Sequence, residues 1–182
     1  MVPDLVTLVD RDDNVVGAEE KIRAHREGKL HRAFSVFVFD DDRRLLIQRR
    51  ATGKYHSAGL WSNTCCGHPR PGESADGAAA RRLAEEMGFA CGLRRAFRTI
   101  YEMSVANAMV EHELNQVFVG RFDRSPQPDS REVGEYRWVE LTELRRSIHA
   151  SPGRYTPWLK LLLENRDWAA VDEILSGRKL PE

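Results

Sequence analysis

The chain has 182 residues, with 28 basic and 28 acidic side chains and a formal net charge of zero. At this length one domain is the expected arrangement, and we predict a single domain over residues 1–182 whose core needs no disulfide staple. The neutral total argues against a general nucleic-acid binder, which needs excess Lys and Arg to displace counterions. It leaves room for a small anionic ligand, because a local cluster of charge can exist within a balanced total.

The sequence predicts neither secretion nor membrane insertion. Residues 1–7 do not have the charged and then apolar pattern of a signal peptide, and no apolar run reaches the length of about 20 residues that spans a bilayer. The three cysteines are an odd number, and Cys65 and Cys66 are adjacent, which makes a poor disulfide framework. We therefore expect a cytoplasmic protein, a monomer or a weak homodimer, without nucleic-acid or membrane partners.

The spacing of apolar residues predicts mixed strands and helices. In chain order, the expected strands are Leu5–Val9, 15–17, 33–39, 45–49, 93–103, 109–122 and 136–139. The expected helices are 19–27, 73–87, 142–147, and one from 156 to about 175 with a break near 166–167. Residues 51–72 and 124–134 lack periodicity and are expected to be loops. Strands and helices without strict alternation indicate the α+β class.

A sequence motif includes the clearest predicted helix, 73–87, and extends a few residues beyond both of its ends. It covers residues 67–89 and reads G-x5-E-x7-R-x-L-x-E-E-x-G-F. Glu85 and Glu86 follow Arg81 by about one helical turn, so these charges can pair on the helix surface. Carboxylates at this spacing can also present oxygen atoms to a hard divalent cation that bridges a diphosphate. A solvated helix with ion pairs is the alternative, and the complete run favours the cation site.

The loop before this helix contains a cysteine in a polar setting. A lone cysteine is most often a small buried residue, and we interpret Cys65 and Cys91 in that way. Cys66 is instead followed by glycine and histidine, directly before the run described above. It is a candidate reactive thiol, on condition that neighbouring cations or a metal lower its pKa.

Two acidic residues lie on one face of a predicted strand. Because side chains alternate along a strand, Glu111 and Glu113 share a face and His112 takes the other. Paired carboxylates repel each other unless a cation or a proton lies between them. From these residues alone, a cation site and an exposed strand face are equally supported.

Three histidines add candidate nitrogen ligands. His25 and His31 lie near the end of the first predicted helix, and His68 lies in the loop at 51–72. None has a diagnostic zinc spacing, so each alone fits a surface or capping histidine. With Glu111 and Glu113 they make a candidate site of three nitrogen and two carboxylate ligands, which suits Mn or Zn.

These signals together resemble a known family. Residues 67–89 resemble the Nudix box, except that Arg82 stands where the hydrolases have a metal-binding carboxylate. The chain from His25 to about Trp158 resembles the type I isopentenyl-diphosphate isomerases, whose members carry Arg at that position. The resemblance rests on H-x5-H-x-A-F-S, R-R-A-x-x-K, W-x-N-x-x-C-G-H-P, the box, Tyr101, Glu111-x-Glu113 and Pro157-Trp158. It implies an α/β/α sandwich with a mixed sheet and additional N- and C-terminal elements.

The resemblance also implies an activity, the reversible isomerisation of isopentenyl diphosphate to dimethylallyl diphosphate in isoprenoid biosynthesis. The reaction would proceed by protonation and deprotonation through a tertiary carbocation. The resemblance implies that Cys66 and Glu113 transfer the protons and that Tyr101 tunes Glu113. Which of the two protonates the substrate in the forward direction stays open.

The remaining implied residues bind metals and substrate. One Mn²⁺ or Zn²⁺ would be held by His25, His31, His68, Glu111 and Glu113. A Mg²⁺ that bridges the substrate diphosphate would be held by Glu86 and the main-chain carbonyl of Cys66. The π face of Trp158 would steady the carbocation. The cations implied around the diphosphate are Lys21, Arg50, Lys54 and Arg82.

Two other interpretations compete with this one. A metal-dependent Nudix diphosphohydrolase would need a carboxylate at the position of Arg82, and it has no use for Cys66 with Glu113. A regulatory domain that binds a metal or a diphosphate without turnover should tolerate the loss of both Cys66 and Glu113.

Overall fold

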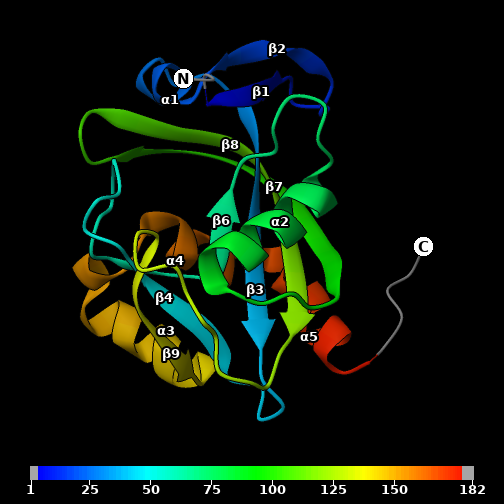
Figure 1. The fold of residues 1–182 in the computed structure, drawn as a ribbon, viewed down its shortest axis with the longest axis vertical. Helices are drawn as coiled ribbons and strands as arrows, with labels where there is room; N and C mark the ends of the chain where they lie inside the picture. Colours follow the sequence, from blue (N-terminus) through cyan, green and yellow to red (C-terminus); the bar gives the residue numbers. More distant parts are fainter. Residues whose placement is uncertain (1–3, 178–182) are drawn as a thin grey trace.

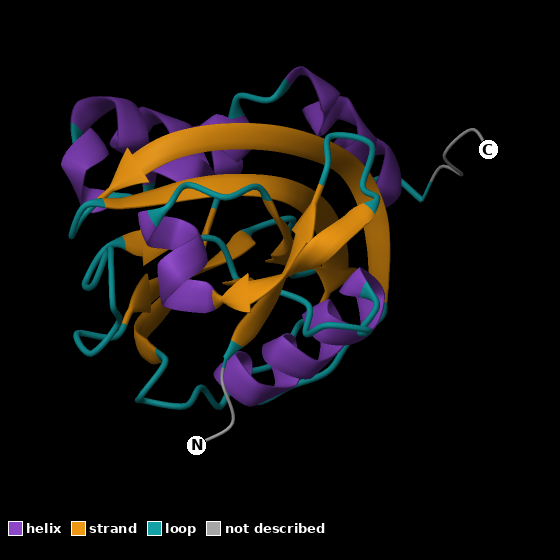
Figure 2. Ribbon diagram, turned by 90° about the horizontal axis from the view of Figure 1, so that it is seen from above, coloured by secondary structure: helices purple, strands orange, loops and turns teal. Residues whose placement is uncertain are grey.

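A mixed β-sheet occupies the middle of the molecule, with helices on both sides of it (Figures 1 and 2). The computed structural model describes residues 4–177, so both ends of the predicted domain, 1–3 and 178–182, lie outside the described residues. The strands are β1 (Leu5–Val9), β2 (Val15–Glu20), β3 (His31–Phe39), β4 (Leu45–Arg50), β5 (Trp61–Ser62), β6 (Cys65–Gly67), β7 (Leu93–Val105), β8 (Met109–Arg121) and β9 (Val133–Val139). The helices are α1 (Lys21–Arg26), α2 (Ala75–Met87), α3 (Leu141–Ala150), α4 (Pro157–Leu163) and α5 (Ala169–Leu175), with 3-10 turns at Pro152–Arg154 and Arg166–Trp168.

Strand β3 is the centre of the sheet. It runs parallel to β8 along its whole length, and β8 continues into an antiparallel pair with β7. On its other side, β3 meets β1, β6 and β4 in turn, all antiparallel. Strand β9 adds to β4, and β2 pairs with β1. One parallel pair among antiparallel pairs makes the sheet mixed, as the resemblance implies.

Apolar side chains fill both sides of the sheet. Phe34, Val36 and Val38 pack with the buried face of α2, whereas Phe37 and Phe39 pack with α3, α4 and α5 on the opposite side. This division follows from the alternation of side chains along β3. Buried on both faces, the strand reads as a continuous apolar run. The predicted α+β class and α/β/α layering are confirmed.

Helix α2 begins and ends at residues suited to each role. The Ser74 side chain accepts a hydrogen bond from the backbone of Gly77 at 3.1 Å, which satisfies one free N–H at the helix start. Gly88 ends the helix in the left-handed conformation, with φ of 72°. A Cβ at Gly88 would lie 2.1 Å from the backbone oxygen of Gln127.

We expect Gly88→Ala to lower the free energy of unfolding by about 1–3 kcal/mol, because it combines left-handed strain with a backbone clash. Gly92→Ala is the matched control, since a Cβ added at Gly92 would have nothing within 4 Å of it. Urea denaturation of both variants measures the difference. Equal losses of stability would contradict this explanation.

Several predicted boundaries are wrong, and each has a local reason. The first helix starts at Lys21 because β2 continues through Glu20, whose side chain caps α1. The long segment expected to be a loop contains β5 and β6, two strands too short to show periodicity. Strand β9 begins at Val133, three residues before the predicted start at Tyr136. Helix α3 is longer at both ends than predicted.

Candidate active site

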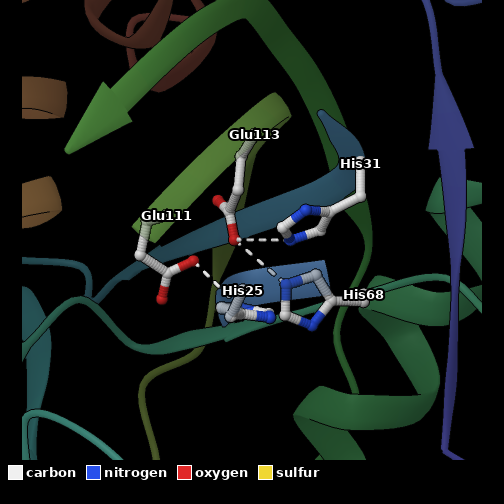
Figure 3. Close-up of side chains that lie close together, drawn as sticks. All are labelled: His25, His31, His68, Glu111 and Glu113. Atoms are coloured by element: carbon white, nitrogen blue, oxygen red, sulfur yellow. Dashed lines mark hydrogen bonds and ion pairs between the residues drawn. The ribbon is translucent and has the colours of Figure 1, made fainter. Parts of the chain in front are cut away.

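Five predicted ligands converge at one end of the central strands. His25 comes from α1, His31 begins β3, His68 follows β6, and Glu111 and Glu113 lie on β8. The parallel register pairs His31 with Glu113. Figure 3 shows the five side chains pointing toward one another, and one ligand atom of each lies within 4.8 Å of all the others. The alternation predicted for β8 is confirmed, because His112 faces away and its Nδ1 contacts the carbonyl oxygen of Gly28.

The histidines present their Nε2 atoms to this cluster. Nδ1 of His25 lies 2.7 Å from the carbonyl oxygen of Lys21, and Nδ1 of His31 lies 2.8 Å from that of Lys29. An N–H at Nδ1 that donates to a carbonyl leaves the Nε2 lone pair free for a metal. Both Nε2 atoms are buried and have no aligned hydrogen-bond partner among the described residues. Such orphaned nitrogen atoms fit a metal ion better than a packed core.

The two carboxylates differ in their surroundings. Burial raises the pKa of Glu113, and the negative charge of Glu111 raises it further. Burial alone would also raise the pKa of Glu111, but His25 and His56 hold it well below its usual value. Burial lowers the pKa of His31 to about 3, so its imidazole is neutral, as a metal ligand must be. Two adjacent carboxylates beside histidine nitrogens suit a divalent cation.

Glu113 also belongs to a buried hydrogen-bonded group. The hydroxyl of Tyr101 donates to Oε2 of Glu113, and Asn115 donates to the same oxygen at 2.9 Å. Oε1 of Glu113 lies 3.0 Å from Nε2 of His68. Tyr101 therefore stands where it can influence the proton affinity of Glu113.

Cys66 reaches the site from β6, which lies along the edge of β3 opposite to β8. Strands β6 and β8 flank β3, with Cys66 opposite Ser35 in the register. Its thiol donates to Oδ1 of Asn63 at 3.0 Å, and the amide nitrogen of Asn63 donates to the carbonyl oxygens of Val36 and Cys65. Cys65 is fully buried and packs on the α2 side of the sheet, which confirms its predicted structural role.

The thiol of Cys66 is held in its neutral form. Burial raises its pKa to about 11, although the hydrogen bond to Asn63 and the charge of Arg50 act in the opposite direction. Neighbouring cations alone therefore do not lower the pKa of this thiol below its usual value. A protonated thiol carries a proton that it can transfer, but it is not a ready nucleophile.

All four predicted cations line one cavity of about 570 Å³ together with Cys66, Tyr101, Glu111 and Glu113. The cavity is lined by Lys21, Arg50, Lys54, Tyr55, His56, Cys66, His68, Arg82, Glu86, Tyr101, Glu111, Glu113, Glu132 and Trp158, among others. Cations and carboxylates thus share one polarised cavity, although the chain as a whole is neutral.

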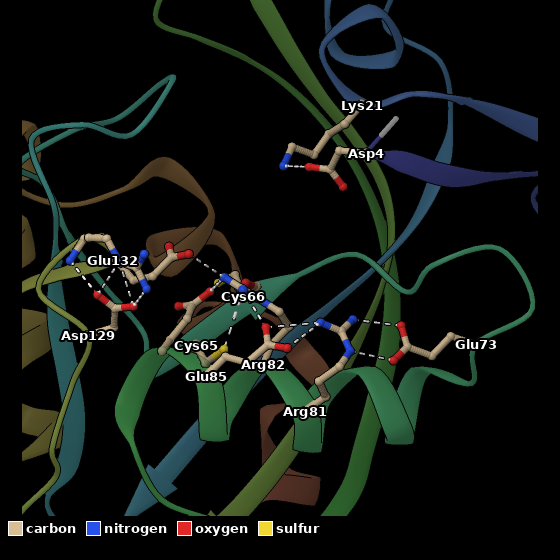
Figure 4. Close-up of polar contacts among 12 residues, drawn as sticks. Asp4, Lys21, Cys65, Cys66, Glu73, Arg81, Arg82, Glu85, Asp129 and Glu132 are labelled. Carbon is tan, nitrogen blue, oxygen red and sulfur yellow. Dashed lines mark hydrogen bonds and ion pairs between the residues drawn. The ribbon is translucent and has the colours of Figure 1, made fainter. Parts of the chain in front are cut away.

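Two of the cations are paired with carboxylates, and Figure 4 shows Arg82 on α2 near Glu85. Arg82 pairs with Glu86, and its guanidinium also lies 2.7 Å from Glu85 and 3.2 Å from Glu132. Lys54 pairs with Glu132. Glu86 is only 3% exposed, and burial raises its pKa. A buried carboxylate at the cavity wall is a suitable ligand for a hard cation.

Arg50 and Trp158 meet deeper in the cavity. The Arg50 guanidinium carbon lies 5.3 Å from the centre of the Trp158 ring, within the range of a cation–π contact. The indole N–H of Trp158 donates to Ser62 at 3.1 Å, which fixes the plane of the ring. Trp158 is 4% exposed, so it also packs in the core. Lys21 reaches the cavity mouth, where it pairs with Asp4.

Sequence reasoning missed three polar residues of this cavity or its wall. They are His56, Asn63 and Glu132. Asn63 belongs to a motif recognised in the sequence, but no role follows from its position there. His56 and Glu132 lie in segments without periodicity, so spacing gives no sign of them.

Comparison with known proteins agrees with this arrangement. The NUDIX domain family matches residues 29–159. The isopentenyl-diphosphate Delta-isomerase of Burkholderia multivorans is 52% identical over 157 residues, which cover 86% of this chain and 89% of that protein. Isopentenyl-diphosphate Delta-isomerase 2 of Photorhabdus laumondii is 47% identical over 170 residues, covering 93% and 96% of the two chains.

Solved structures show the same fold at low identity. The crystal structure of DR0079 from Deinococcus radiodurans superposes with a TM-score of 0.73 at 20% identity, covering 88% of this chain and 97% of that one. A MutT NUDIX hydrolase from Burkholderia pseudomallei gives a TM-score of 0.58 at 21% identity, covering 75% and 98%. The NUDIX match and the identity and coverage of the sequence relatives assign the chain to the isopentenyl-diphosphate Delta-isomerase family of NUDIX-domain proteins.

Proposed function

We propose that this enzyme interconverts isopentenyl diphosphate and dimethylallyl diphosphate. The observation that carries the proposal is that Cys66, Tyr101 and Glu113 line the same cavity as the four cations. The family assignment supports the same reaction. A hydrolase is not favoured, because Arg82 replaces the expected carboxylate and is engaged by Glu86.

The proposed reaction needs two proton-transferring groups. One group delivers a proton to the terminal carbon of the alkene, which creates a tertiary carbocation at the branched carbon. The other removes a proton from the neighbouring methylene on the opposite face, and the new double bond forms there. Cys66 and Glu113 enter one cavity from the two strands that flank β3, and their separate positions support these two roles. Tyr101 adjusts the proton held by Glu113 through their hydrogen bond.

The proposed metals divide between the two ends of the cavity. His25, His31, His68, Glu111 and Glu113 would hold one Mn²⁺ or Zn²⁺, which would supply positive charge beside the buried carboxylates. Glu86 and the main-chain carbonyl of Cys66 would face a Mg²⁺ that enters with the substrate diphosphate. These roles rest on the clustered donors and on the burial of Glu86.

The proposed substrate contacts follow the charges in the cavity. Lys21, Arg50, Lys54 and Arg82 would bind the diphosphate. Lys21, Lys54 and Arg82 would exchange carboxylate partners for phosphate oxygens. Trp158 would present its π face to the carbocation, an arrangement that also keeps water from the reactive carbon.

The setting of the enzyme is also a proposal. We infer a single domain that works in the cytoplasm on a small diphosphate, as a monomer or a weak homodimer and without nucleic acid or membrane. The neutral charge and the cysteine pattern support this view. Among residues 4–177, no helix is long and apolar enough to cross a bilayer.

Incubation of the protein with isopentenyl diphosphate and Mg²⁺ in deuterated water tests the activity. We expect dimethylallyl diphosphate in the NMR spectrum, with deuterium at the positions that gain or exchange protons. Inorganic phosphate or monophosphate in place of the isomer would reject the proposal in favour of a hydrolase. Binding of substrate without any product would favour a regulatory domain.

A further inference from the structure

A fourth histidine, His56, lies against the metal-ligand cluster without belonging to it. It stands in the segment between β4 and β5 and is 2% exposed. Among the described residues, the group whose ligand atoms all lie within 4.8 Å consists of His25, His31, His68, Glu111 and Glu113. His56 therefore needs an explanation other than direct ligation.

The contact of His56 is with one oxygen of Glu111. Its Nε2 lies 2.8 Å from Oε1 of Glu111, while Nε2 of His25 lies 3.2 Å from Oε2 of the same carboxylate. Each oxygen of Glu111 thus faces a different histidine. A carboxylate that uses one oxygen as a metal ligand commonly has the other oxygen fixed by a neighbouring donor.

The surroundings of His56 favour a proton on Nε2. Nδ1 lies 3.2 Å from the hydroxyl oxygen of Ser57, which can donate to it and so leave Nε2 as the donor. Ser57 itself adopts a left-handed backbone with φ of 51°, which is strained for a serine. Strain of this kind beside a functional site indicates that the position of the side chain matters.

The ring of His56 is also held on its other sides. Arg50 donates to the carbonyl oxygen of His56 at 3.1 Å. The ring meets Trp158 edge-on at 5.8 Å and Tyr55 at 4.4 Å between centroids. Asn107, at the turn between β7 and β8, donates to the carbonyl of Tyr55 at 2.7 Å and so ties this segment down.

We propose that His56 is a positioning residue that holds Oε1 of Glu111 so that Oε2 faces the metal site. Nε2 of His56 has no aligned hydrogen-bond partner among the described residues, although Oε1 is in contact with it. A small turn of the carboxylate toward a bound ion would align the two atoms. This inference rests on the proposed metal site. It goes beyond that site because it assigns a role to a residue that is not a ligand.

Metal affinity of the variants His56→Phe and His56→Gln tests this inference. Zn²⁺ or Mn²⁺ affinity is measured by competition with a chromogenic chelator, without reference to turnover. We expect His56→Phe to weaken binding by about 10- to 100-fold, because no donor remains for Oε1. His56→Gln keeps an N–H donor and should recover most of the affinity. His149→Phe, on an exposed part of α3, is the matched control.

The outcomes separate the inference from the proposed function. Wild-type affinity in His56→Phe, together with a large loss in Glu111→Gln, would reject the role of His56 and leave the metal site standing. Wild-type affinity in Glu111→Gln as well would reject the metal site itself. Equal losses in the Phe and Gln variants would assign the effect to packing and also reject the positioning role. The far-ultraviolet circular dichroism of the metal-free variants checks that each one is folded.

Discussion

Replacing Cys66 by Ala is expected to lower the rate of isomerisation by about 1,000-fold or more, because the variant lacks one of the two proton-transferring groups. The thiol lines the cavity and is held in its neutral form by burial. Alanine removes the proton without adding bulk, so the fold should survive. Exchange of substrate C–H protons with deuterated water, followed by NMR, measures the effect.

Glu113→Gln is expected to have an effect of the same size at the other proton-transferring position. The amide keeps the shape of the side chain but cannot take and return a proton. Cys91→Ala and Glu102→Gln are the matched controls, since Cys91 lies outside the cavity and Glu102 is exposed on β7. Normal exchange in Cys66→Ala or in Glu113→Gln would overturn the assignment of roles. The metal content of each variant is measured in parallel, so that a loss of proton transfer can be told from a loss of the ion.

The site could be predicted from sequence wherever local geometry decides which residues meet. Alternation along a strand places Glu111 and Glu113 on one face and His112 on the other, and the register confirms it. The spacing of a helix likewise brings Arg82 to Glu86. Cys65 and Cys66 separate to opposite sides of the sheet for the same reason. These features depend on the period of one element alone.

The period of one helix or strand cannot predict which separate elements come together in the fold. His31 and His68 come close to Glu113 because β3 lies between β6 and β8, and α1 adds His25. The residue types suggested this ligand set, but their spacing along the chain could not show that they meet. The pKa of Cys66 also depends on burial, which the polar loop sequence conceals. The contact of His56 with Glu111 could not be predicted, because its irregular segment has no pattern that indicates which side chain faces Glu111.

His31→Ala is expected to remove the metal ion and, with it, the activity. The imidazole of His31 is fully buried, and its pKa is lowered to about 3, so this residue offers a neutral nitrogen at neutral pH. Loss of the ion also leaves the negative charges of Glu111 and Glu113 without a cation between them. We expect metal affinity to fall by about 100-fold or more and turnover to fall in step. His112→Ala is the control, because that histidine faces away from the cluster.

The same metal should stabilise the fold of the wild-type protein. An ion that binds only the native state adds about 4 kcal/mol at a free concentration 1,000 times its dissociation constant. Added Mn²⁺ or Zn²⁺ should therefore raise the melting temperature of wild type and His112→Ala but leave His31→Ala nearly unchanged. Chelator-treated wild type should lose activity and regain it with the ion that binds most tightly. Full activity after complete removal of the metal would contradict this prediction. It would mean that the two buried carboxylates function without a cation between them, and that the clustered donors serve the structure and not the reaction.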